Sequence, residues 1–194
     1  MVIHGESVYL DSTKYKSLDH VKISSDVKYI EGDLPSFDYD IYVNRIEDWI
    51  SKDLQNPIFD ENTKLYVDNK LAEDIVISEG VESIKGRAFF GCSSLTNIFI
   101  PKSVTSIGES FLFNCSGLTS CTIGSGVTSI GQTVFSYCNR LSSITVNATT
   151  PPTLGNNVFQ STNNCPIYVP ANSVNAYKSA SGWSSYSSRI QAIP

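Results

Sequence analysis

The 194-residue chain has few groups that can carry acid–base or metal chemistry. It contains only two histidines, His4 and His20, and their spacing is not that of a metal site or an acid–base pair. The chain has 14 Lys and Arg residues and 19 Asp and Glu residues, which gives a net charge of −5. This charge excludes the basic surface with which proteins bind nucleic acids. No apolar run approaches the roughly 18–20 residues that span a bilayer. The composition therefore predicts a soluble, mildly acidic globular protein.

Other functional motifs are missing as well. The first six residues lack the basic and apolar regions of a signal peptide. There is no Cys-x-x-Cys motif, no phosphate-binding glycine loop and no assignable Ser–His–Asp arrangement. The carboxylates of Asp38 and Asp40, and of Asp60 and Glu61, are interpreted as solvated loop charges, since a calcium site at residues 60–62 would lack the loop signature. We therefore predict no enzyme activity, no metal and no cofactor.

A 23-residue repeat organises the second half of the chain. Ile84, Ile107 and Ile130 recur at this interval, and other residue types recur at their own positions. The other repeated positions are Val81, Val104 and Val127; Cys92, Cys115 and Cys138; Leu95, Leu118 and Leu141; Ile98, Cys121 and Ile144; Ile100, Ile123 and Val146. A fixed period of this length is typical of a protein built from stacked structural repeats.

Each repeat contains a short strand motif, Leu-x-x-Ile-x-Ile, as in residues 95–100. Alternation along a strand turns Ile98 and Ile100 inward and Asn97 and Phe99 outward. Such a strand cannot bury its apolar side alone, whereas turns stacked about 4.8 Å apart form a continuous core. Strands with this apolar-x-apolar pattern are predicted near residues 21–23, 41–43, 75–77, 98–100, 121–123, 144–146 and 167–169.

The strand motif and its period place the chain among leucine-rich repeats. The finer pattern, Val-Thr-Ser-Ile-Gly-x-x-x-Phe-x-x-Cys-x-x-Leu-x-x-Ile-x-Ile-Pro, resembles the BspA-like family of bacterial surface proteins, and residues 71–169 carry the resemblance. Residues 168–183 are similar to the tail that often follows the last repeat of that family. We predict a mainly β α/β repeat protein: a right-handed solenoid of about seven coils, with helical or 3-10 turns near 88–92, 111–115 and 134–138, and a C-terminal cap.

The resemblance also implies a location and a function. It implies extracellular or cell-surface exposure, and non-enzymatic adhesion to a host protein, a matrix component or a glycan on a host or neighbouring cell. It implies no catalytic residues. The alternative function is a structural spacer that holds another domain or anchor and has no ligand of its own. A monomer is expected, with no nucleic-acid partner and no membrane span.

We expect one solenoid domain over residues 1–194. Its parts would be degenerate N-terminal coils over 1–43, a helix-plus-hairpin insertion over 44–74, regular repeats over 75–169, and a C-terminal cap over 170–194.

Within the insertion, the spacing of Ile46, Trp49, Ile50 and Leu54 suits a short amphipathic helix. Asn44 would be its N-cap and Pro57 its stop. Residues 65–71 suit a hairpin with an Asp-Asn turn. In the cap, a helix over 173–180 would begin at Asn172 or Ser173 and end at Gly182, and Trp183, Tyr186 and Ile190 would cover the last coil.

The repeat also predicts the core and the state of the thiols. Cys92, Cys115 and Cys138 should stack as unpaired thiols that cap backbone amides in the turn, because a line of thiolates lacks the convergent geometry of a metal site. Cys121 should be buried, and Cys165 should be the most accessible. The predicted core consists of Ile84, Phe89, Leu95, Ile98, Ile107, Leu118, Ile123, Ile130, Phe135, Leu141 and Ile144.

The predicted binding face is the set of outward strand positions from the second to the fifth strand. One row would be Tyr42, Val76, Phe99 and Thr122, and the polar row beside it Asp40, Asp74, Asn97 and Ser120. Stacked strands would join Tyr42, Val76 and Phe99 into a contiguous apolar strip, and such strips often mark interaction sites. In the alternative, residues 44–74 fold over the strip and bury Phe99 under Trp49 or Tyr66.

Overall fold

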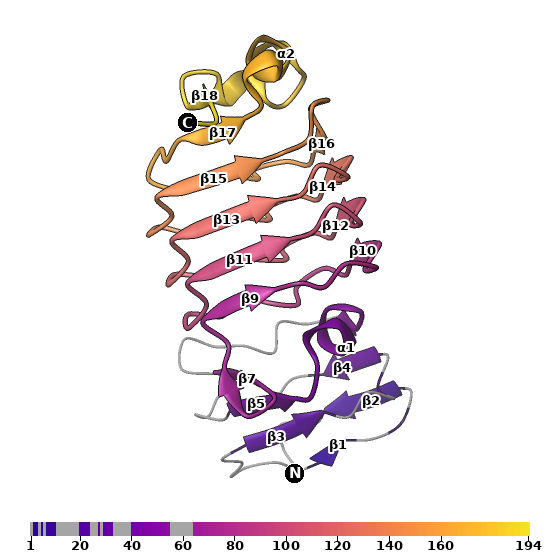
Figure 1. Ribbon diagram of the computed structural model, residues 1–194. Helices are drawn as coiled ribbons and strands as arrows, with labels where there is room; N and C mark the ends of the chain where they lie inside the picture. The colour runs from indigo at the N-terminus through magenta and orange to yellow at the C-terminus, as the bar shows by residue number, and fades with distance from the viewer. Residues whose placement is uncertain are drawn as a thin grey trace.

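The computed structural model describes residues 2–3, 5, 7–10, 20–23, 27, 29–32, 40–54 and 64–194. Short parallel strands stack along one axis in this part of the chain, which confirms the predicted solenoid (Figure 1). A strand occurs at each of the predicted positions: β3 (His20–Ile23), β5 (Asp40–Val43), β9 (Asp74–Val76), β11 (Asn97–Ile100), β13 (Ser120–Ile123), β15 (Ser143–Val146) and β17 (Ile167–Val169).

The main sheet has six strands in the order β18-β17-β15-β13-β11-β9. Its pairs are parallel and in register, so that Ile98 lies beside both Ile75 and Cys121. The last strand, β18 (Ile190–Ala192), was missed in the sequence, although Ile190 follows Ile167 by one repeat length and pairs with it. The repeat therefore continues by one strand into the C-terminal segment.

Each regular coil has two further sides. One is a four-stranded parallel sheet, and the other is a turn whose amides donate to the next coil, as Phe89 N does to Phe111 O at 2.9 Å. The predicted turns near 88–92, 111–115 and 134–138 are single 3-10-type turns rather than continuous helices, because residues such as Arg87 and Gly91 have positive φ (63° and 77°). The four strands are β10 (Ser83–Ile84), β12 (Ser106–Ile107), β14 (Ser129–Ile130) and β16 (Thr153–Leu154).

The N-terminal region forms two separate sheets. The first has the order β1-β3-β5-β7-β8, and the second the order β2-β4-β6. The segment 44–74 is more than an insertion, because β7 pairs in parallel with β5 and adds a coil that the sequence analysis missed. The strands not yet given are β1 (Val2–Ile3), β2 (Ser7–Leu10), β4 (Tyr29–Gly32), β6 (Asp53–Leu54), β7 (Leu65–Val67) and β8 (Lys70–Leu71).

The hairpin over residues 65–71 is present. Strands β7 and β8 are antiparallel, and the two residues between them, Asp68 and Asn69, have φ of 49° and 60°. Two successive positive φ values are those of the type I′ turn, which Asn and Asp tolerate better than other side chains. Because β8 returns antiparallel, the parallel stack that begins at β1 ends here.

Helix α1 (Ile46–Ile50) is shorter than the sequence suggested. Its N-cap is Arg45 in an extended conformation without a side-chain cap bond, so the assignment of Asn44 was wrong. Leu54 belongs to β6 instead of the helix, and Pro57 lies outside the described residues.

The helix joins the N-terminal region to the regular repeats. The indole Nε1 of the buried Trp49 donates to Ala88 O at 2.7 Å. Lys85 N donates to Ile50 O at 3.0 Å, as Gly108 N does to Ile84 O in the coil above. Helix α1 therefore occupies the position of a preceding coil beneath the four-stranded sheet.

The C-terminal cap closes the other end of the core (Figure 1). It contains the 3-10 helices η1 (Ala171–Ser173) and η2 (Ser184–Tyr186) and the helix α2 (Val174–Ser179), which ends shortly before Gly182 at φ 80°. Tyr177 and Trp183 are fully buried, and they donate to Ala148 O at 2.8 Å and to Pro152 O at 2.6 Å. These contacts cover the apolar end that a solenoid must protect from water.

All of the predicted core residues are buried, and all five cysteines are free and buried. Two of the thiols also act as donors: Cys115 Sγ donates to Phe89 O at 2.9 Å and Cys138 Sγ to Leu112 O at 3.1 Å. The reason is that carbonyl groups of the preceding coil point at these sulfurs. Cys165 has the largest exposure of the five, but at 5% it is still covered, with Arg189 Nη2 at 3.2 Å from its sulfur.

Candidate functional site

The outward face of the main sheet is open at β9 and β11. Val76 and Phe99 lie side by side in register and are 68% and 42% exposed. The alternative, in which residues 44–74 bury Phe99 under Trp49 or Tyr66, is wrong, because Phe99 is exposed. Trp49 points into the core, and Tyr66 stacks on Tyr42 instead.

The expected strip of Tyr42, Val76 and Phe99 is not contiguous. Tyr42 pairs with Tyr66 of β7, with ring centroids 4.5 Å apart and ring planes 7° apart, and β8 then ends that sheet. The physical reason is the missed coil, since β7 occupies the position next to β5 that the prediction gave to β9. Desolvation, and then the neighbouring Asp40 and Tyr66, raise the pKa of the Tyr42 hydroxyl. Tyr42 and Asp40 therefore belong to a different surface from Val76.

The predicted polar row exists within the main sheet as a hydrogen-bond ladder. Asn97 Nδ2 donates to Asp74 Oδ1 at 2.6 Å, and Ser120 Oγ donates to Asn97 Oδ1 at 2.5 Å. Thr96 Oγ1 adds a bond to Asp74 Oδ1 at 3.1 Å. Thr122, in the outward apolar row, pairs with Phe99 and is half-buried. The structure therefore brings Asp74, Asn97 and Ser120 together, with most of their polar groups engaged in one another.

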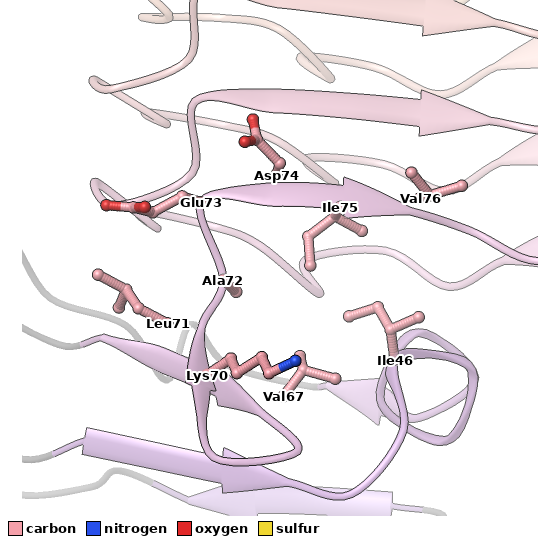
Figure 2. A pocket seen from close by; sticks show the side chains of 9 residues that line it. All are labelled: Ile46, Val67, Lys70, Leu71, Ala72, Glu73, Asp74, Ile75 and Val76. Carbon is pink, nitrogen blue, oxygen red and sulfur yellow. The ribbon is translucent and has the colours of Figure 1, made fainter.

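A groove that the sequence analysis missed adjoins this face. It lies between β8 and β9, has a volume of about 350 Å³, and exists because the two sheets end on either side of it (Figure 2). Figure 2 shows the Asp74 carboxylate pointing away from the groove, in agreement with its bonds to β11. The lining residues are Ile46, Val67, Lys70, Leu71, Ala72, Glu73, Asp74, Ile75 and Val76.

A second aromatic group lies on the turn side of the coils, where Tyr137 is exposed and Phe90 and Phe113 are half-buried. Phe90 stacks on Phe113 with centroids 4.6 Å apart, and Phe113 meets Tyr137 edge-on at 5.3 Å. The 23-residue spacing of Phe90 and Phe113 could have predicted this pair. Because the two Phe rings stack on one another, each ring covers one flat face of the other.

Among the described residues, no three His, Cys, Asp or Glu side chains form a group that could hold a metal ion. Burial raises the pKa of Cys115 well above its usual value and that of Cys138 to about 12, so these thiols are protonated near neutral pH and are weak nucleophiles. No helix within the described residues is long and apolar enough to cross a membrane.

Comparison with known proteins agrees with the repeat architecture. The family model of the BspA type leucine rich repeat region matches residues 51–183 with six copies, which is more than half of the chain. The match begins before β7, in agreement with the coil that β7 contributes. No curated protein matches the chain at a significant level. The chain therefore belongs to the BspA-type leucine-rich repeat family.

Proposed function

We propose that the chain is a non-enzymatic binding module whose contact surface is the outward face of β9 and β11 with the adjoining groove. The observation that carries the proposal is the pair Val76 and Phe99, two large apolar side chains that are adjacent and exposed. The hydrogen-bonded row of Asp74 and Asn97 borders them. Apolar patches with a polar rim often mark interaction sites.

The proposed setting is the surface of a bacterial cell or its surroundings, where the partner is a protein, a matrix component or a glycan. Proteins with this type of repeat are commonly surface-associated. The five free cysteines are compatible with an oxidising environment because all are buried, and burial suppresses the thiolate that oxidants attack. We further propose that the module acts as a monomer, and its net charge of −5 argues against a nucleic-acid partner.

A structural spacer is the second candidate function, and one observation favours it. On β13 and β15 the outward residues in the row of Phe99 are small and polar, namely Thr122 and Thr145. Hydroxyl ladders run alongside them: Thr119 Oγ1 donates to Thr96 O at 3.0 Å and Ser142 Oγ to Thr119 O at 2.9 Å. Such a surface stiffens the stack without offering an apolar anchor to a partner.

Binding of the full chain to a panel of immobilised matrix proteins and glycans separates the two candidates. For any partner found, Phe99→Ala is expected to weaken affinity by about tenfold or more, because truncation of a central aromatic side chain removes a large share of the binding energy. Thr145→Ala, two strands away on the same face, is the matched control and is expected to bind normally. Absence of binding throughout the panel favours the spacer, and unchanged affinity of Phe99→Ala rejects this site.

A further inference from the structure

Two strand edges face each other across the groove. Strand β9 is the last strand of the six-stranded sheet, and β8 is the last strand of the sheet below it. The chain passes from one to the other through Ala72 and Glu73, without pairing the two strands (Figure 2). A strand edge matters because it carries a row of backbone donors and acceptors that can accept another strand.

The register shows which backbone groups of β9 point into the groove. In β11, Asn97 N donates to Glu73 O of the preceding coil at 3.1 Å, and Phe99 O accepts from Ile77 N of the same coil at 3.0 Å. Asn97 and Phe99 therefore direct their backbone groups toward the preceding coil. Asp74 and Val76 are the residues of β9 in register with them.

By this equivalence the N–H and C=O groups of Asp74 and Val76 point toward the groove. Among the described residues, no backbone or side-chain partner is found for these groups. In β11 and β13, the same positions are paired with the strand below. The edge of β9 is thus an open position in an otherwise paired stack.

The groove beside this edge has the composition of a peptide site. Val67, Leu71 and Ile75 supply an apolar lining, and the volume of about 350 Å³ lies within the usual range for ligand sites, toward its small end. Binding modes that add a strand take affinity from the main chain and specificity from pockets for alternate side chains.

We infer that the groove binds an extended peptide segment of a partner protein, which adds to β9 as a strand. Its backbone bonds to Asp74 and Val76, and its alternate side chains enter the apolar lining. This inference rests on the proposed function and narrows the partner of that surface to a protein, because a glycan lacks the regularly spaced amide groups of a strand.

A peptide library provides the probe. A phage-displayed library of random heptapeptides is panned against the full chain, and the enriched peptides are synthesised. We expect apolar residues at alternate positions. N-methylation of one alternate set of amides should weaken binding by at least about tenfold, while methylation of the other set should have little effect, since only one edge of an added strand faces β9. Failure to enrich any peptide, or equal tolerance of both methylation patterns, would overturn the inference.

Two variants test the same backbone group from the protein side. Val76→Pro deletes the N–H that faces the groove, and proline is accepted where an edge strand carries no ladder bond. Val76→Ala trims the side chain but keeps the amide. We expect Val76→Pro to bind the peptide at least about tenfold more weakly than Val76→Ala, because both variants lose the valine side chain and only the proline also loses the amide. Equal binding of the two variants would contradict strand addition, and the methylated peptides keep the test valid if Val76→Pro does not fold.

The outcomes separate this inference from the proposed function. Phe99→Ala could weaken the affinity for a partner from the panel, while peptide affinity depends neither on the methylation pattern nor on Val76→Pro. In that case the sheet face is a binding surface and strand addition is wrong. If neither Phe99→Ala nor Val76→Pro affects any interaction, both proposals are wrong.

Discussion

The regular repeats and the N-terminal region bury the same kind of core with different coil lengths. Inward residues of the main sheet keep the 23-residue spacing from Ile75 to Ile190, whereas the N-terminal sheet joins Val21, Ile41 and Leu65 at intervals of 20 and 24. All of these residues are buried. Exclusion of water therefore depends on the stacking of inward side chains and tolerates variation in the length of the coil between them.

A constant coil length also allows side-chain hydrogen bonds to repeat from coil to coil. In the regular repeats, Thr96 Oγ1 donates to Glu73 O at 3.0 Å, and Thr119 and Ser142 repeat the bond one and two coils further on. Such a ladder requires a hydroxyl side chain at the same height in every coil, and a fixed period supplies it. Each bond contributes about 0.5–1.5 kcal/mol, so the period stabilises the regular region beyond its core.

The largest expected effect comes from a cavity in either region. Ile107→Ala is expected to lower the free energy of unfolding by about 2–5 kcal/mol, since the side chain is buried and its neighbours above and below are fixed. Ile41→Ala should cause a loss of similar size in the same urea transition, because Trp49 and Ile50 link the two regions. Two unfolding steps, with Ile41→Ala altering only the first, would show that the regions fold separately.

The next effect tests how tightly the coils approach one another. An ideal Cβ on Gly126 would collide with the carbonyl oxygen of Lys102 in the preceding coil. Its φ is not positive, so a Gly→Ala change here should otherwise gain about 0.4–1 kcal/mol from the unfolded chain. We expect Gly126→Ala to lose roughly 1–3 kcal/mol instead, measured by thermal unfolding against the exposed control Ser125→Ala. A stabilised Gly126→Ala would mean that the coils can move apart.

The sequence predicted the strands and the core of the regular region because both follow from local rules. Alternation decides which residues of a strand face inward, and a fixed period decides that the strands stack. Positions such as Ile98 and Leu118 could therefore be assigned to the core without a structure. The same rules, applied to Leu65 and Ile190, contained a signal that was not used: each repeats the apolar position of the preceding strand at the spacing of one coil.

The candidate site was less predictable, for a physical reason. The exposure of Val76 and Phe99 follows from alternation, but their separation from Tyr42 follows from the antiparallel return of β8. Whether a hairpin ends a sheet or lies over it is decided by tertiary contacts, here the stacking of Tyr66 on Tyr42. The groove is a consequence of where two sheets stop, and no motif in the sequence encodes that point.

The thiols provide a pH test that applies to the regular repeats. Burial raises the pKa of Cys138 to about 12 and that of Cys115 well above its usual value. Above the unfolded pKa of about 8.5, the unfolded chain releases these protons while the folded chain keeps them, so stability falls as pH rises. One pH unit above that value the loss is about 1.4 kcal/mol for each suppressed thiol.

The measurement is the free energy of unfolding between pH 7 and 10 for the natural chain and for Cys138→Ala. The variant should lose less stability over this interval, although it starts lower because the bond to Leu112 O is gone. Equal pH slopes for the two proteins would contradict the assignment. A thiol reagent should label five cysteines in the denatured, unreduced chain. In the folded chain it should label none of them quickly, because all five are buried.

The smallest expected change in stability comes from truncating the outward aromatic residue of each region. Tyr42 stacks on Tyr66 in the N-terminal sheet, whereas Phe99 is 42% exposed beside Val76 and Thr122. Tyr42→Ala should lower the free energy of unfolding by about 0.5–1.5 kcal/mol, which is the usual contribution of an aromatic pair. Phe99→Ala should stay within about 0.5 kcal/mol of the natural chain in the same urea titration, because a surface side chain without a specific partner adds little. A marked loss on Phe99→Ala would assign this ring a role in folding and leave its exposure without a functional reason, whereas the expected result means that the ring is available for a partner.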